Sequence, residues 1–258
     1  MEERKQKERE FHNLLQKKHS EDRRSSDKFY SIVRRSDALM KSWVRARSEN
    51  RWALDYGCGD GSYTILMAKG GAQAVGIDIS DVSLQNAKKC AVQEGIDRRA
   101  QFLVMDCESL AFADNSFDII VSRAILHHLD LDKALAELAR VVKKEGAIIC
   151  IEALADNPLI QMYRRITPNE RTEWEIDHVL RAKDLKVAKT YFGKVDVKFF
   201  HLFTLAAVPF RNSRIFKALL SVLEIADSVA LRLPFLKRMG WQMVFVLSEP
   251  NNALANPE

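Results

Sequence analysis

Three short apolar segments of the chain each end in an acid, and one of them leads into a glycine-rich turn. The acids are Asp55, Asp78 and Asp106. The turn covers residues 56–61, has glycine at every second position from Gly57, and runs into a helical pattern near Tyr63. Glycine permits positive φ angles and a close approach of a ligand to the backbone. Because the helix N-terminus adds free N–H groups and partial positive charge, a ligand with a carboxylate, or a nucleotide, could bind there.

The spacing of the acids supports this interpretation. Asp78 lies about 20 residues beyond the glycine-rich turn, the spacing at which a carboxylate receives ribose hydroxyls in a doubly wound sheet. Asp106 ends the third apolar segment. The carboxyl ends of parallel strands lie at one edge of a sheet, and ligands bind at that edge in open α/β folds. The acids are therefore expected around one site.

The elements that would position these residues alternate between strand and helix. The expected strands are 52–56, 73–78, 101–105, 117–122, 146–152, 195–203 and 241–247, and the expected helices include 62–69, 81–94, 131–143 and 184–191. Continuous apolar strands separated by helices indicate a parallel sheet that is covered on both faces. We predict an α/β fold with a doubly wound, mostly parallel, seven-stranded sheet. It should form one domain, 51–250, preceded by a helical cap, 1–50, and followed by a disordered tail, 251–258.

The order of these motifs resembles that of class I S-adenosylmethionine (SAM)-dependent methyltransferases. The resemblance is strongest to the type 11 group, which includes ubiquinone and menaquinone biosynthesis enzymes. The matching segments are 54–61 (Leu-Asp-Tyr-Gly-Cys-Gly-Asp-Gly), 76–80 (Gly-Ile-Asp-Ile-Ser), 106–110, 117–122, 126–129 (Leu-His-His-Leu) and 139–146. The match runs from about Asp55 to Glu152. It implies a Rossmann-like fold and SAM as the cofactor.

The resemblance also implies which residues bind the cofactor. In that family the glycine-rich turn lies against the methionine part of SAM, the acid after the second strand binds the ribose, and the acid after the third lies near the adenine amino group. The positions that carry over are Asp55, Gly57, Cys58, Gly59, Asp78, Ile79, Asp106, Cys107 and Arg123. Tyr30 is a further candidate contact, for which the alternative is a core aromatic.

Candidate residues for the acceptor side follow the fourth and fifth strands. His127 and His128 should lie at the same sheet edge, and a histidine near neutral pH can take a proton from an attacking hydroxyl. The resemblance allows this role in some O-methyltransferases, with His128 slightly favoured, and packing or substrate shaping is the alternative. Tyr163, Arg164 and Arg171 could bind substrate, since arginine holds phosphate or carboxylate, although a helix with a salt-bridged face explains them equally well.

Two segments outside the sheet leave more than one interpretation open. Residues 2–18 mix charges of both signs, which favours a solvated helix over a lid on the cofactor, and 29–46 are more amphipathic. An insertion at about 204–239 has a broad apolar face that charges interrupt, so it is not a transmembrane span. Packing on the core is its default role, but its basic residues also permit a lid over an apolar substrate or a peripheral membrane contact.

Composition argues against several classes of protein. The net charge is +5, with charges of both signs interspersed rather than gathered in the one-signed patch that nucleic-acid binding requires. No obligate protein partner is inferred. The four cysteines show no CxxC spacing and no cluster has the spacing of metal ligands, so neither disulfides nor a metal is expected. The first residues are charged, which argues against a signal peptide and favours a cytoplasmic protein, with membrane association as an option.

We therefore expect a methyl group to pass from SAM to a small or lipid-like acceptor, with oxygen favoured over carbon or nitrogen. This in-line displacement needs alignment, exclusion of water and, for a hydroxyl, removal of a proton. The Asn/Asp-Pro-Pro-Tyr tetrad of many amino-nitrogen methyltransferases is absent after the fourth strand. The alternatives are a non-catalytic SAM-binding protein, an RNA methyltransferase and an NAD-dependent oxidoreductase. The oxidoreductase fingerprint separates its last two glycines more widely than Gly59 and Gly61.

Overall fold

The fold is built on a seven-stranded sheet. The computed structural model describes residues 3–19, 27–166, 172, 174 and 178–251. The strands lie in the order β3-β2-β1-β4-β5-β7-β6, and the pairs that include β7 are antiparallel while the others are parallel. Their bounds are β1 Trp52–Tyr56, β2 Gln73–Asp78, β3 Ala100–Val104, β4 Phe117–Arg123, β5 Val142–Ala153, β6 Phe192–Phe200 and β7 Gln242–Pro250. The predicted doubly wound, mostly parallel sheet is confirmed.

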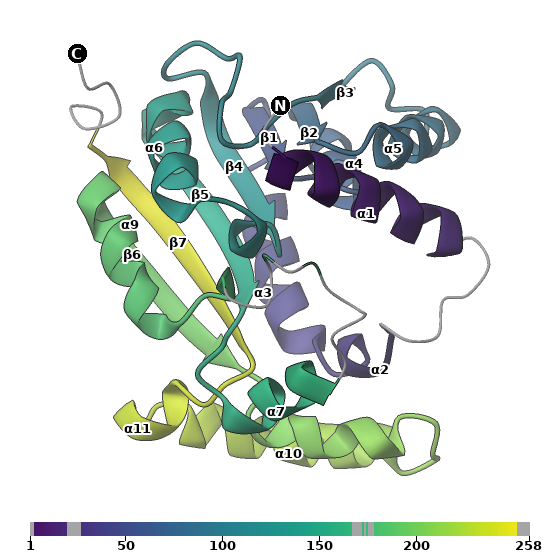
Figure 1. The fold of residues 1–258 in the computed structure, drawn as a ribbon, viewed down its shortest axis with the longest axis vertical. Coiled ribbons are helices and arrows are strands. Elements are labelled where there is room, and N and C mark those ends of the chain that lie inside the picture. Colours follow the sequence, from purple (N-terminus) through teal and green to yellow (C-terminus); the bar gives the residue numbers. More distant parts are fainter. Residues whose placement is uncertain (1–2, 20–26, 167–171, 173, 175–177, 252–258) are drawn as a thin grey trace.

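Helices cover both faces of the sheet (Figure 1). One face carries α6 (Leu131–Val141) and α9 (Leu185–Tyr191), and the other carries α3 (Arg34–Arg45), α4 (Ser62–Lys69) and α5 (Asp81–Gln93). Side chains alternate along a strand, so Leu54 and Tyr56 join the core under α6 while Ala53 joins the core on the opposite face. Both faces of β1 are therefore buried, as its continuous apolar sequence predicts.

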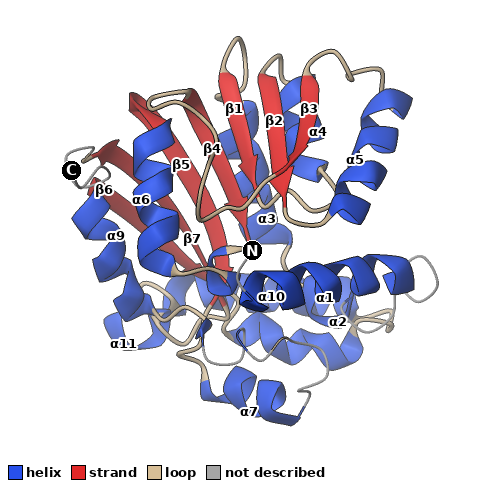
Figure 2. Cartoon of the chain, turned by 45° about the horizontal axis from the view of Figure 1, so that its top comes forward, coloured by secondary structure: helices blue, strands red, loops and turns tan. Residues whose placement is uncertain are grey.

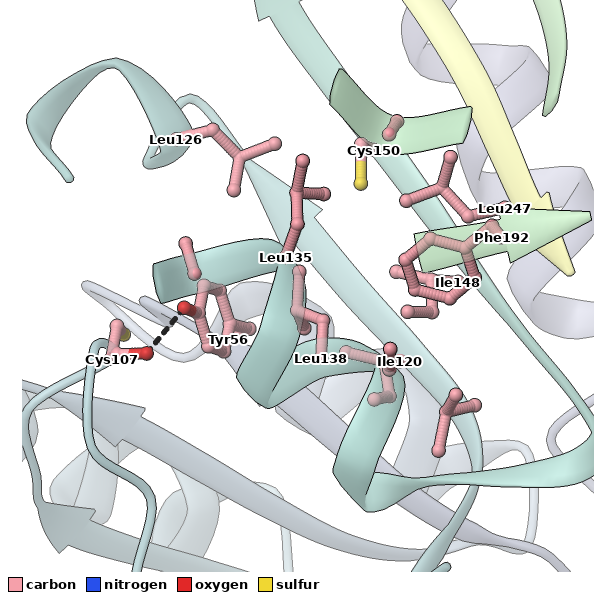
Figure 3. Packing of buried hydrophobic residues seen from close by; sticks show 14 of the residues in the cluster. Tyr56, Cys107, Ile120, Leu126, Leu135, Leu138, Ile148, Cys150, Phe192 and Leu247 are labelled. Atoms are coloured by element: carbon pink, nitrogen blue, oxygen red, sulfur yellow. Dashed lines mark hydrogen bonds between the residues drawn. The ribbon is translucent and has the colours of Figure 1, made fainter. Parts of the chain in front are cut away.

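Figure 3 shows how side chains pack in the core under α6. Leu135 and Leu138 of α6 pack in the same fully buried cluster as Ile120 of β4. Tyr56, at the end of β1, is fully buried in this cluster, and its hydroxyl donates a hydrogen bond of 2.5 Å to the carbonyl oxygen of Cys107. This bond ties the end of β1 to the loop that follows β3.

Several helices lie outside the two layers. α1 (Glu3–His19) lies across the carboxyl ends of β1, β2 and β3 (Figure 2). The others are α2 (Asp27–Tyr30), α7 (Pro158–Ile166), η3 (Ala182–Asp184) and, between β6 and β7, η4 (Phe203–Phe210), α10 (Phe216–Ala230) and α11 (Pro234–Lys237). A small core with Ile32, Ile160, Leu220 and Trp241 joins the insertion to the N-terminal segment. None of the described helices has both the length and the apolar character needed to cross a bilayer.

Differences from the expected elements are confined to their ends and to one break. β6 ends at Phe200 rather than 203, because the next residue, His201, has a φ of 66° and turns the chain out of the sheet. The expected helix at 29–46 is interrupted at 31–33, between α2 and α3. Residues 252–258, where a disordered tail is predicted, lie outside the described residues. The boundaries of the cap and of the domain stay predictions.

Candidate active site

One cavity of about 800 Å³ lies at the carboxyl ends of β1–β4. All nine residues that the sequence assigned to cofactor binding line it, and so does Tyr30. The nine are Asp55, Gly57, Cys58, Gly59, Asp78, Ile79, Asp106, Cys107 and Arg123. The volume lies within the range of about 300–1,000 Å³ that is typical of small-molecule sites. The topology therefore brings residues from four strand ends to a single site.

The glycine-rich turn between β1 and α4 takes a backbone conformation that side chains disfavour. Gly57 has a φ of 72°, and an added Cβ would come within 2.5 Å of the side chain of Ile125. Gly59 has a φ of 50°, but an added Cβ there would meet no atom within 4 Å. Gly57 is thus needed for close packing against the chain after β4. Gly59 leaves open space at the cavity wall, where a ligand can approach the backbone.

Two of the acids hold this turn in place. Asp78, at the end of β2, accepts hydrogen bonds of 2.8 Å from the backbone N–H groups of Gly59 and Ser80. Asp55, at the end of β1, accepts two bonds of 2.7 Å from the backbone and hydroxyl of Thr64. Burial raises the pKa of Asp55 to about 7 in spite of these donors. Each oxygen of Asp78 keeps a second lone pair that a ribose hydroxyl could use.

Two thiols and one arginine at the cavity wall differ in charge and therefore in how they could contact a ligand. Burial raises the pKa of Cys58 and of Cys107, so both thiols are protonated and weakly nucleophilic at neutral pH. These side chains are suited to packing against a ligand. Arg123 lies at the end of β4, with its guanidinium 5.8 Å from the ring centre of Tyr30. It offers a positive charge for a ligand carboxylate.

α1 is held against the cavity by ion pairs and is not the solvated helix that its charge pattern favoured. Its ion pairs include Arg4–Glu108 at 2.5 Å, Lys5–Asp106 at 2.6 Å and Arg9–Asp81 at 2.9 Å. Arg4, Lys5, Glu8 and His12 line the cavity, and Glu8 is only 6% exposed. The acids that pair with its basic residues lie about 70 to 100 residues away in sequence. A local charge pattern does not reveal such partners, so the sequence favoured a solvated helix. The lid interpretation matches this placement.

The two histidines of η1 (Leu126–His128) point to different partners. Nδ1 of His127 lies 2.7 Å from Oε2 of Glu152. The other oxygen of Glu152 accepts hydrogen bonds from the backbone N–H groups of Ile125 and Leu126. This pair is buried and holds the turn onto β5. His128 lines the cavity, and its Nδ1 lies 3.1 Å from Oε2 of Glu8. The role of either histidine as a proton acceptor stays a prediction.

Of the three predicted substrate-binding residues, the structure describes the side chain of Arg164 alone. Arg164 lies in α7 and is not among the described residues that line the cavity. Arg171 lies outside the described residues, and so does the side chain of Tyr163. The cavity-lining residues of α1 that sequence reasoning missed are Arg4, Lys5, Glu8 and His12. Their spacing of three and four residues, which places them on one helix face, was the available signal.

Comparisons with known proteins agree with this architecture. Residues 54–150 match the family model described as a methyltransferase domain. The uncharacterized methyltransferase YcgJ of Bacillus subtilis is 32% identical over 127 residues, 48% of this chain and 49% of that protein. A demethylmenaquinone methyltransferase of Bacteroides fragilis is 35% identical over 115 residues, 43% of this chain and 47% of the relative. The chain thus matches about half the length of these two relatives.

Solved structures share the fold. The crystal structure of YcgJ aligns with a TM-score of 0.56 and 18% identity, over 86% of this chain and 100% of that one. The crystal structure of geranyl diphosphate C-methyltransferase from Streptomyces coelicolor aligns with a TM-score of 0.59 and 12% identity, over 89% of this chain and 86% of that one. The fold, the glycine-rich turn and the strand-end acids match those of class I methyltransferases. The match to the methyltransferase domain model covers residues 54–150, and SAM is the cofactor of methyltransferases of this class.

Proposed function

We propose that this protein transfers a methyl group from SAM to a small or lipid-like molecule. The observation that carries the proposal is the convergence, on one cavity, of all nine residues that the sequence resemblance assigned to cofactor binding. The glycine-rich turn would hold the methionine part, Asp78 the ribose and Asp106 the adenine amino group. SAM supplies the activated methyl carbon, and the protein aligns the acceptor and excludes water.

The position of α1 suits the exclusion of water. The helix lies across the strand ends, and its ion pairs fasten it to acids that follow β2 and β3. Lys5 binds the Oδ2 atom of Asp106, so the adenine amino group and Lys5 would share this carboxylate. SAM would have to enter before α1 closes fully, since α1 forms one wall of the same cavity.

The acceptor side is proposed from position and from relatives. His128, rather than His127, is the histidine of the acceptor site, because it lines the cavity whereas His127 is held behind it by Glu152. A relative that is named a demethylmenaquinone methyltransferase supports a lipid-like acceptor. Oxygen is our first choice of acceptor atom. Carbon is the second, favoured by the structural neighbour that is named a C-methyltransferase.

We also propose that the helical insertion contacts an anionic membrane surface. Its outward face exposes Val222, Ile225 and Val229 of α10, each more than 60% accessible, and Phe235 of α11. The acids within residues 203–240, Glu224 and Asp227, are both buried, while the exposed charges are basic: Arg211, Arg214, Lys217, Arg232 and Arg238. Apolar side chains among exposed positive charges complement the headgroup region of an anionic bilayer.

An acceptor screen tests the main proposal. Purified protein is incubated with SAM carrying a labelled methyl group and with fractionated small-molecule, lipid and RNA extracts. We expect the label in a small-molecule or lipid fraction, and much less of it with the Asp78→Ala variant. Label confined to RNA would instead support an RNA methyltransferase. No transfer to any fraction by protein that binds SAM would support the non-catalytic alternative.

A further inference from the structure

Three side chains meet at one point on the cavity wall. Oε2 of Glu8 lies 3.1 Å from Nδ1 of His128 and 3.6 Å from Nε2 of His12. One donor atom from each residue lies within 4.8 Å of the other two. We propose that Glu8, His12 and His128 bind one divalent transition-metal ion, with Zn²⁺ as the best match to two imidazoles and a carboxylate.

The distances between the donor atoms agree with this assignment. Zinc bonds of about 2.0–2.2 Å in a tetrahedron place neighbouring donor atoms about 3.3–3.5 Å apart. The two contacts of Glu8, at 3.1 and 3.6 Å, lie on either side of this range. Glu8 and His12 are one turn apart on α1, so they share a face of the helix, and His128 faces them from η1. Small side-chain movements are enough to close the set around an ion.

The surroundings of Glu8 also suit a ligand. Glu8 is buried, and its Oε2 accepts no hydrogen bond of good geometry from the part of the chain that the structure describes, although an imidazole nitrogen is 3.1 Å away. Donor atoms around a shared ion have this arrangement, because their lone pairs converge on the ion rather than on each other. Oε1 accepts a hydrogen bond of 2.5 Å from Thr172, the kind of outer contact that orients a ligating carboxylate.

Neighbouring charges do not prevent a cation from binding. The two positive side chains that precede Glu8 on the cavity wall are engaged with acids, Arg4 with Glu108 and Lys5 with Asp106 and Glu108. His127 is held by Glu152. With one carboxylate, two neutral imidazoles and a divalent ion, the occupied site would have a net charge of +1. This charge favours an electron-rich oxygen as the fourth ligand.

The place of the site specifies what the ion would do. Three protein ligands leave a coordination position open toward the cavity, as in metal sites that act on substrates. An ion there would lower the pKa of an acceptor hydroxyl bound to it. This role toward the acceptor depends on the proposed methyl transfer, whereas metal binding does not. In this arrangement His128 would be a metal ligand and not a free base, because an imidazole that binds a metal through Nδ1 carries its proton on Nε2.

The test is metal binding by the protein of residues 1–258 after chelator treatment. We expect calorimetry with ZnCl₂ to give one tight site per chain, and CoCl₂ to give the visible absorption bands of a four-coordinate nitrogen–oxygen site. His12→Ala should weaken binding by about 100-fold or more and abolish the bands, since a direct ligand matters at least as much as an outer contact. His178→Ala, which removes an exposed histidine outside the cavity, is the matched control and should bind metal like the unchanged protein.

Equal zinc affinity in the unchanged protein and in the His12→Ala variant would overturn the inference, and so would the absence of tight binding in both. Circular dichroism establishes that each variant is folded. SAM is titrated separately into the metal-free protein. Failure of SAM to bind would count against the proposed methyl transfer while leaving the metal result intact, so the two failures can be told apart.

Discussion

Asp78 is the residue on which the cofactor assignment depends most at the scale of single side chains. Hydrogen bonds from two backbone N–H groups hold its carboxylate in place at the cavity wall. We predict that Asp78→Ala weakens SAM binding by about 1–3 kcal/mol, because charge-assisted hydrogen bonds are lost. Calorimetry measures the change, with Asp97→Ala at an exposed position as the control. Unchanged affinity in a folded Asp78→Ala variant would show that Asp78 is not the ribose ligand.

The adjacent histidines should respond differently to substitution. His128→Ala is expected to lower turnover by about 10²–10⁴-fold with SAM affinity retained, because the group that handles the acceptor's proton is lost. His127→Ala should instead lower the free energy of unfolding by about 1–3 kcal/mol, because it removes the partner of a buried carboxyl group. Methyl-transfer assays and urea denaturation measure the two effects. Full activity in His128→Ala would remove that residue from the acceptor site.

At the level of elements, the residue that follows β6 is a buried histidine that makes stability depend on pH. His201 is 2% exposed, and its Nε2 lies 2.8 Å from the hydroxyl of Ser36. Burial lowers the pKa of His201 to about 4, from 6.5. Between these values the unfolded chain binds a proton that the folded chain does not. Stability therefore falls as the pH falls from 6.5 to 4, by up to about 3.5 kcal/mol at about 1.4 kcal/mol per pH unit.

Replacement of His201 should remove this dependence. We predict that His201→Asn, in which asparagine tolerates the positive φ, makes the free energy of unfolding change less between pH 7 and pH 5 than it does in the unchanged protein. Urea denaturation at the two pH values measures this, and the exposed His178→Asn is the control. The same pH dependence in His201→Asn and in the unchanged protein would mean that His201 is not its source.

The central elements could be predicted from the sequence, whereas the position of α1 against the cavity could not. The strand at 73–78 and the helix at 62–69 are observed with the expected bounds, because periodicity and glycine positions report local structure. The contacts of α1 are not local: Lys5 meets Asp106, and Glu8 meets His128. Charge patterns do not reveal partners that distant in sequence. The cluster of Glu8, His12 and His128 could not be predicted from the sequence for the same reason.

At the scale of the whole molecule, the insertion should direct the protein to anionic membranes. We predict sedimentation with vesicles that contain anionic lipid, and weaker binding as salt increases. Replacement of Val222, Ile225 and Val229 by Ser should weaken binding by at least about tenfold, since buried apolar area contributes to it. Val92→Ser, at an equally exposed valine of α5, is the control. Protein that stays in solution with anionic vesicles at low salt would contradict the membrane proposal.

The cavity at the strand ends should bind SAM, and calorimetric titration of the purified protein measures this binding. SAM, S-adenosylhomocysteine and, as a control, NADH are titrated separately into folded protein that is free of carried-over ligand. We predict micromolar binding of the first two and no binding of NADH, because the glycine spacing and Asp106 fit the methyltransferase cofactor. The absence of SAM binding would contradict the account, and binding of NADH in its place would favour the oxidoreductase.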